Sequence, residues 1–150
     1  MRANKALIQL LDRMKIDLSR PSTIPSERSL PALIRVGDAT FLDSEYSKSR
    51  HVSLRDFPDL TGLECFVNHI HIPYHRDRPS LLEALSYVKG LQRSLCSLES
   101  DEDFVIVLSV SGSSTVIRFH KNRQGEAWLA PDIERYEEPV GVFNLKDAER

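Results

Sequence analysis

The sequence predicts a single α+β domain in which helices pack on a central mixed or mainly antiparallel sheet. Residues 104–110 form a dense apolar, β-branched run, residues 115–120 alternate between apolar and polar, and residues 111–114 between them are small and polar. This arrangement is typical of a β-hairpin. Residues 80–98 instead repeat apolar side chains at helical spacing,. A length of 150 residues with 41% hydrophobic and 28% charged content fits one globular domain,.

The hairpin should lie in the middle of the sheet. Its first run is apolar on both faces, which indicates a strand with neighbours and packing on every side. The second run places Thr115, Ile117 and Phe119 on one side and Val116, Arg118 and His120 on the other. We therefore expect the second strand to present one face to water or to a partner.

The N-terminal segment is expected to be a helix followed by a connector. Residues 3–18 carry apolar side chains at spacings of four, three and four, at Leu7, Leu11, Met14 and Leu18. This pattern predicts an amphipathic helix packed on the body of the domain, with a loosely attached helix as the alternative. Residues 19–31 contain three prolines, which exclude a continuous helix or a central strand. We interpret them as an extended connector, so that the compact core spans residues 32–145.

The middle of the chain is expected to begin with a small hairpin formed by residues 32–36 and 40–42. Residues 43–55 are mostly polar and are predicted to be mainly loop. Residues 63–72 carry apolar side chains on both faces of an alternating pattern and are predicted to be an interior strand, with His69 and His71 near its end,.

The remaining elements follow from start and stop signals. Ser80 and Glu83 match a capping box and predict the start of the strongest helix. Residues 131–136 are compatible with one helical turn, and residues 139–145 with a last strand. Residues 146–150 are predicted to be a frayed tail.

Composition favours a cytoplasmic protein that does not cross a membrane. No apolar run approaches 18 residues, and charges interrupt the N-terminal apolar stretch too early for a signal peptide,. Cys65 and Cys96 each lie in an apolar element and are expected to be reduced core thiols. The net charge is −2, but residues 1–35 carry +4 and residues 99–150 carry −5. The acidic C-terminal third argues against nucleic-acid binding and mildly for a basic partner.

The best metal candidate is the pair His69 and His71, because residues two apart on a strand point to the same side. His75 follows four residues later, but no third ligand has a recognised spacing. Structural histidines and partner-contacting histidines are the alternatives. Nucleophile-elbow, Walker and dinucleotide-binding motifs are lacking in the sequence,. We therefore expect neither an enzyme nor a cofactor.

Two stretches resemble a known group of proteins. They are residues 60–72, LTGLECFVNHIHI, and residues 116–129, VIRFHKNRQGEAWL, followed by Asp132, Glu134 and Tyr136. Within residues 52–145 the chain is similar to immunity proteins of contact-dependent growth inhibition and related bacterial polymorphic toxin systems. The resemblance implies a cytosolic, non-catalytic protein that binds and neutralises the C-terminal domain of one cognate toxin.

If the toxin is a nuclease with a positive cleft, an acidic surface would complement it. The predicted partner-binding residues are Glu126, Asp132, Glu134, Tyr136, Glu137 and Glu138. Trp128 is expected to fill the core, and the strand face of Arg118 and His120 is the alternative contact. Two other functions remain open: a small metal-dependent hydrolase that uses His69, His71 and His75, and an interaction subunit with an unrelated partner.

Overall fold

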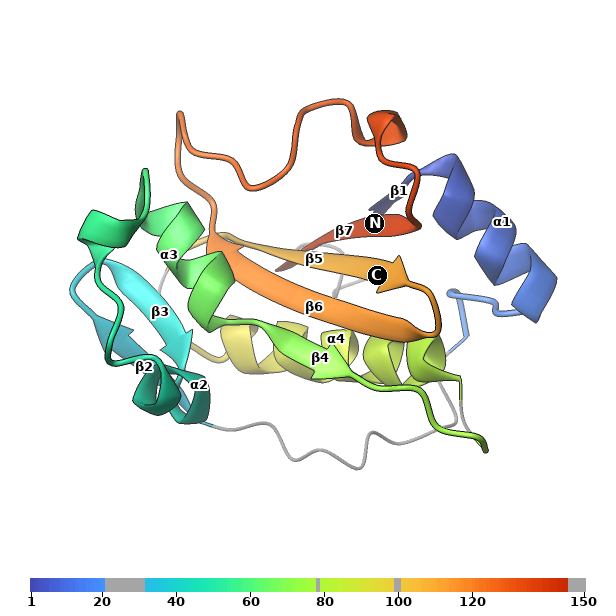
Figure 1. The fold of residues 1–150 in the computed structure, drawn as a ribbon, viewed down its shortest axis with the longest axis horizontal. Coiled ribbons are helices and arrows are strands. Elements are labelled where there is room, and N and C mark those ends of the chain that lie inside the picture. The colour runs from blue at the N-terminus through green and yellow to red at the C-terminus, as the bar shows by residue number, and fades with distance from the viewer. Residues whose placement is uncertain (21–31, 78, 99–100, 146–150) are drawn as a thin grey trace.

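The computed structural model describes residues 1–20, 32–77, 79–98 and 101–145. It confirms an α+β domain built on a five-stranded sheet in the order β1-β7-β5-β6-β4, with every neighbouring pair antiparallel (Figure 1). The strands of this sheet are β1 (Arg2–Ala3), β4 (Ile70–Ile72), β5 (Phe104–Ser111), β6 (Ser114–Lys121) and β7 (Val140–Asn144). A separate hairpin consists of β2 (Leu33–Val36) and β3 (Ala39–Leu42), as predicted.

The predicted central hairpin is β5 and β6. The strands pair along their whole length, and β5 lies between β6 and β7, so its central position is confirmed. The turn is tighter than expected, because Ser111 already pairs with Ser114. Gly112 in the turn has a φ of 60°, a conformation that suits glycine and matches the tight turns of hairpins,.

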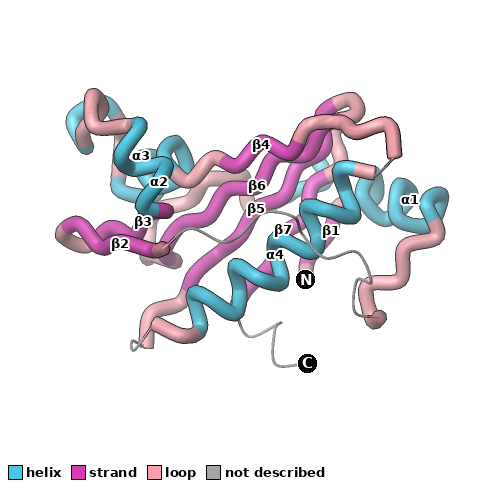
Figure 2. Tube along the Cα trace, turned by 90° about the horizontal axis from the view of Figure 1, so that it is seen from below, coloured by secondary structure: helices cyan, strands magenta, loops and turns pink. Residues whose placement is uncertain are grey.

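Four α-helices accompany the strands in the described ranges: α1 (Lys5–Met14), α2 (Asp43–Lys48), α3 (Leu60–Val67) and α4 (Ser80–Cys96). Helix α4 crosses one face of the large sheet (Figure 2), and its Leu85 and Leu91 are buried, as the sequence predicted. Two short 3-10 turns, Leu54–Asp56 and Ile133–Arg135, complete the fold. The second of these confirms the helical turn expected at residues 131–136.

The prediction of one strand over residues 63–72 is wrong. Helix α3 occupies the first half of this segment, and strand β4 begins only at Ile70. The buried residues follow a helical spacing instead, at Thr61, Glu64, Cys65 and Asn68. Three of these four side chains are polar, so hydrophobicity alone could not reveal the helical face.

The N-terminal segment belongs to the core, so the interpretation that the core begins at residue 32 is corrected. Strand β1 pairs with β7 at the edge of the sheet. Leu7 and Leu11 of α1 are buried in the same apolar cluster as Leu91 of α4. Most of the predicted connector, residues 21–31, and the predicted tail, residues 146–150, lie outside the described residues.

Three smaller predictions also need correction. Residues 43–55 are not mainly loop, because α2 and a 3-10 turn form there. The capping box at Ser80 does not form: its hydroxyl instead donates to the carbonyl of Ser113 in the central hairpin, 2.7 Å away. Cys65 is buried, but Cys96 is exposed at the end of α4 and is not a core thiol.

Candidate functional site

The two faces of the large sheet differ in what covers them. Helix α4 packs on the inner face, and residues that pair directly across antiparallel strands project to the same face. On that basis we define the outer face by His71, Val105, Val107, Val116, Arg118, His120 and Val142. Arg118 and His120 therefore share one side of β6, as the alternation in the sequence predicted.

Residues 122–139 join β6 to β7 and form a long loop on the side of the molecule opposite α4 (Figure 1). In this loop Trp128 remains 39% exposed, so it does not fill the core as expected. The guanidinium carbon of Arg118 lies 5.3 Å from the centroid of the Trp128 ring, which is a cation–π contact,. The loop thus places an aromatic side chain next to the outer face.

The loop is held at both ends by hydrogen bonds. The Glu126 carboxylate accepts from the backbone N–H and the hydroxyl of Thr61, at 3.0 and 2.8 Å, near the start of α3. At the other end, the side-chain amide of Asn4 donates to the carbonyls of Tyr136 and Glu138, at 3.2 and 2.8 Å. Any surface that the loop forms is therefore fixed to the body of the domain.

A shallow groove lies between the loop and the outer face. Val105, Val107 and Val142 contribute to its apolar lining, and Arg2, His120, Asn122 and Glu126 contribute polar groups. Its volume is about 130 Å³. Pockets for small-molecule substrates usually measure roughly 300–1,000 Å³. The groove therefore suits a single side chain better than a whole substrate.

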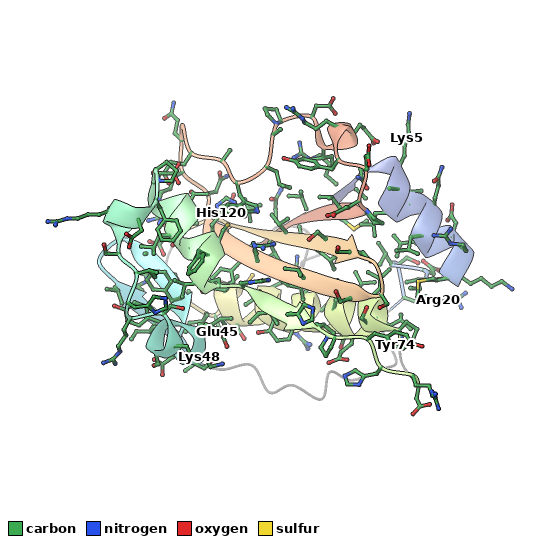
Figure 3. The ribbon with its side chains drawn as sticks, viewed as in Figure 1. Lys5, Arg20, Glu45, Lys48, Tyr74 and His120 are labelled. Carbon is green, nitrogen blue, oxygen red and sulfur yellow. The ribbon has the colours of Figure 1, made fainter. Side chains whose placement is uncertain are left out.

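His120 has a defined tautomer. The residue is only 5% exposed and lies near the end of β6, beside α3 (Figure 3). Its Nδ1 is 2.9 Å from the carbonyl oxygen of Lys121, and since a carbonyl only accepts, Nδ1 must carry the proton,. Burial lowers the pKa of this imidazole below its ordinary value, so the neutral form dominates near pH 7,. Nε2 is then an unprotonated hydrogen-bond acceptor.

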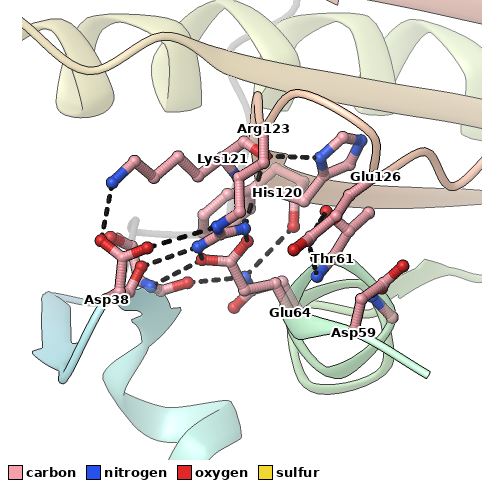
Figure 4. Close-up of polar contacts among 12 residues, drawn as sticks. Asp38, Asp59, Thr61, Glu64, His120, Lys121, Arg123 and Glu126 are labelled. Atoms are coloured by element: carbon pink, nitrogen blue, oxygen red, sulfur yellow. Dashed lines mark hydrogen bonds and ion pairs between the residues drawn. The ribbon is translucent and has the colours of Figure 1, made fainter. Parts of the chain in front are cut away.

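Glu64 is the centre of a second polar cluster, and this one is structural (Figure 4). Its side chain is fully buried and accepts from the backbone N–H groups of Thr40 and Lys121, at 2.8 and 2.9 Å. The Arg123 guanidinium donates to both carboxylate oxygens, at 2.7 and 3.1 Å. This carboxylate joins α3, β3 and β6, and its four hydrogen bonds leave it no surface for chemistry.

The three histidines of the predicted metal site do not assemble into one. His69 lies before β4 rather than on it, so the strand geometry expected for His69 and His71 is lost. Both residues and His75 are exposed. Partial desolvation of its ring by neighbouring groups, together with the positive charge of Arg118, lowers the pKa of His69 although the residue as a whole is exposed. Among the described residues, no group of three or more His, Cys, Asp or Glu side chains is positioned to hold a metal ion.

Several of the predicted partner-binding residues are engaged within the protein. Besides Glu126, the Glu134 carboxylate accepts from the backbone N–H of Lys5 at 3.1 and 3.2 Å, at the start of α1. Asp132 accepts from the backbone N–H of Glu134 at 3.0 Å. The Tyr136 hydroxyl accepts from the N–H of Ala130 at 2.9 Å. These side chains shape the loop, which limits what they can offer to a partner.

Glu137 and Glu138 are the exposed acids of the predicted set that lie nearest β7. Residues 122–139 as a whole carry five acidic and two basic side chains. One of the two basic residues, Arg123, is paired with buried Glu64. The loop surface is therefore predominantly negative.

Sequence reasoning missed the groove and the Glu64 cluster. The groove depends on where the loop runs over the sheet, and no local pattern encodes that path. A signal for the cluster was present, because Thr61, Glu64 and Asn68 are spaced three and four apart. Polar residues at helical spacing within an apolar segment indicate a helix whose buried face bonds to other elements.

Comparison with known proteins identifies a family. The model described as Uncharacterized protein PM0498 family matches residues 2–150, and the chain belongs to that family. No curated protein and no solved structure matches the chain. Among the described residues, no helix has the length and apolar character needed to cross a membrane.

Proposed function

We propose that this protein is a cytoplasmic immunity protein that binds and neutralises the C-terminal domain of a cognate bacterial toxin. The contact surface in this proposal is the outer face together with the loop of residues 122–139. Neither nucleic acid nor a membrane is a partner in this proposal. The protein acts by occupying the toxin rather than by catalysing a reaction.

The observation that carries the proposal is the pair formed by the half-buried Arg118 and the exposed Trp128, beside a groove the size of one side chain. Trp and Arg are among the residues most enriched in the energetic centres of protein interfaces. The hydrogen bonds that hold the loop to Thr61 and Asn4 preorganise this surface, which reduces the entropy lost on binding,.

The charge of the loop supports a basic partner. Its negative surface would attract the positive cleft of a nuclease toxin and would compete there with nucleic acid. Because such attraction is screened over about 8 Å at physiological salt, association should slow as salt rises. The exposed Glu137 and Glu138 are the acids best placed to contribute.

The test first asks whether the gene immediately upstream encodes a large secreted protein, and then uses the C-terminal domain of that protein as the toxin. Rescue of cells that express this domain, and its affinity measured by calorimetry, should both depend on the outer face. Trp128→Ala should cost about 2 kcal/mol or more in binding, which is roughly 30-fold in Kd. Ile8→Ala is the matched control, because Ile8 is an exposed apolar side chain on α1, away from the sheet face.

Charge reversal provides an independent arm. Glu137→Lys combined with Glu138→Lys should slow association most at low salt. Glu134 is left intact, because its carboxylate holds the start of α1 and its loss would confuse folding with binding. Failure to bind any neighbouring toxin domain would reject the immunity function. Tight binding that ignores Trp128→Ala would keep the function but move the contact surface elsewhere.

A further inference from the structure

We propose that the groove between the outer face and the loop is a receptor for one cationic side chain, an arginine or a lysine, supplied by the partner. The inference rests on the proposed function only in naming a protein as the source of that side chain. The groove's own chemistry can be tested without the partner.

The first argument is the acceptor on the groove's polar side. His120 is only 5% exposed, and it lines the groove. With Nδ1 donating to the Lys121 carbonyl, Nε2 has a lone pair but no partner within the described residues. Nε2 is not fully shielded from solvent, so a donor from outside the chain can reach it through the groove and bond to it in place of water,.

The second argument is the neighbouring carboxylate. Glu126 also lines the groove, and its contacts with Thr61 use Oε2 alone. Oε1 is therefore a second acceptor, and it carries negative charge. Two acceptors of which one is charged favour a ligand that donates hydrogen bonds and is itself positive.

The third argument is the fit of the groove to the rest of such a side chain. Val105, Val107 and Val142 offer apolar surface for the methylene stem of an arginine or lysine,. A volume of about 130 Å³ lies well below the roughly 300–1,000 Å³ of pockets that hold whole small molecules, so the groove has room for part of a ligand such as one side chain,.

The protein's own arginines near the groove are already engaged. Arg118 lies over the Trp128 ring, and Arg2 donates to the carbonyl of Pro131 at 3.3 Å. The first of these contacts also shows that the Trp128 ring accepts a guanidinium at this place. Arg2 itself lines the groove, but its hydrogen bond goes to Pro131, so the acceptors on His120 and Glu126 remain open to a cation from outside.

Occupancy should depend on pH through His120. The charged groups around this imidazole are Arg2 from β1, Asp59 and Glu64 from α3 and its cap, Lys121 from β6, and Arg123 and Glu126 from the loop. Protonation places a proton on Nε2 and a positive charge beside the groove, so the acceptor is lost. Because burial lowers the pKa of His120 below its ordinary value of 6.5, cation binding should be full at pH 7.5 and should be lost only at a pH below 6.5,.

The experiment follows the ring nitrogens of His120 by ¹⁵N NMR in the full chain while butylguanidinium, butylammonium, butylurea or p-cresol is added. Butylurea has nearly the shape of butylguanidinium without its charge, and p-cresol represents a tyrosine. We expect the Nε2 chemical shift to change saturably with either cation. The affinity for butylurea should be at least tenfold weaker, and p-cresol should cause no change.

Two variants complete the design. Glu126→Gln keeps an oxygen that can accept from Thr61 but removes the charge, and it should weaken cation binding by about tenfold. Asp12→Asn, which removes the same charge from the exposed surface of α1, should change nothing. Equal binding of butylurea, preference for p-cresol, or no shift with any cation would each overturn the proposal. If the groove binds cations but no toxin domain binds the protein, the immunity function is rejected and the cation receptor stands. If a toxin domain binds but the groove binds no cation, the cation receptor is rejected and the immunity function stands.

Discussion

Replacement of buried Glu64 by glutamine should destabilise the fold strongly, although the two side chains have nearly the same shape. The carboxylate accepts four hydrogen bonds, from Thr40, Lys121 and the two terminal nitrogens of Arg123. A glutamine amide turns one acceptor into a donor, which then faces other donors. It also removes the buried charge that pairs with the Arg123 guanidinium, whose side chain is only 10% exposed, and leaves the exposed Asp38 carboxylate, 3.5 Å from Nε, as its ion-pair partner.

The magnitude follows from the loss of one partner of a buried ion pair, which typically costs 3–5 kcal/mol. We expect Glu64→Gln to lose about that much free energy of unfolding in a urea titration. The control is Glu137→Gln, the same substitution at an exposed site, which should stay within about 0.5 kcal/mol of wild type,.

A double-mutant cycle sharpens the test. Arg123→Met alone should also be costly, because it leaves a buried carboxylate unpaired. Added to Glu64→Gln it should cost much less, because the pair has already been broken, with a coupling energy of about 1–3 kcal/mol. A loss below about 1 kcal/mol for Glu64→Gln, or strict additivity in the cycle, would refute the assignment of this cluster as the joint between α3, β3 and β6.

Three further predictions concern the core and the histidines. Leu85→Ala in α4 should cost about 2–5 kcal/mol in a denaturant melt, and a change under about 1 kcal/mol would show that another face of the helix packs on the sheet,. Leu7→Ala should cost a similar amount, so deletion of residues 1–18 should abolish cooperative unfolding; a truncated chain that still melts cooperatively would place α1 outside the core. Protein purified without chelator should contain no stoichiometric zinc, iron or manganese by elemental analysis, whereas one equivalent that disappears with His69→Ala and His71→Ala would restore the metal site.

Some elements could be predicted because their signals are local and strong. In β5 both faces are apolar, and the structure gives it a strand on each side and α4 below. Helix α4 repeats leucines at helical spacing, and the same leucines are buried. In both cases the residues that the pattern selects are the residues that pack, so periodicity and burial agree.

Other elements could not be predicted because their buried side chains are polar or have partners that are distant in the sequence. Helix α3 buries Glu64 and Asn68, which a reading based on hydrophobicity assigns to the surface. Asn68 is acceptable there because its side chain bonds to the backbone of Leu42, Thr40 and Phe119. These partners are more than twenty residues away in the sequence, so the residues near Asn68 cannot predict them.

The candidate site shows the same division. The alternation in β6 was enough to place Arg118 and His120 on one side of a strand. The alternation could not show that Trp128 lies over Arg118, or that Glu126 is held by Thr61 beside the groove.

The sequence by itself therefore determined the fold class, the central hairpin, the main helix and the sign of the charge on the C-terminal third. The tertiary structure decided that the first fourteen residues join the core, that residues 60–67 are a helix, and that the long loop forms a groove on the sheet. The physical reason is one of range. Apolar periodicity is a local signal that predicts which face of a helix or strand is buried. Buried carboxylates, buried amides and loop contacts instead depend on donors and acceptors that are distant in the sequence and that only folding brings within hydrogen-bond distance.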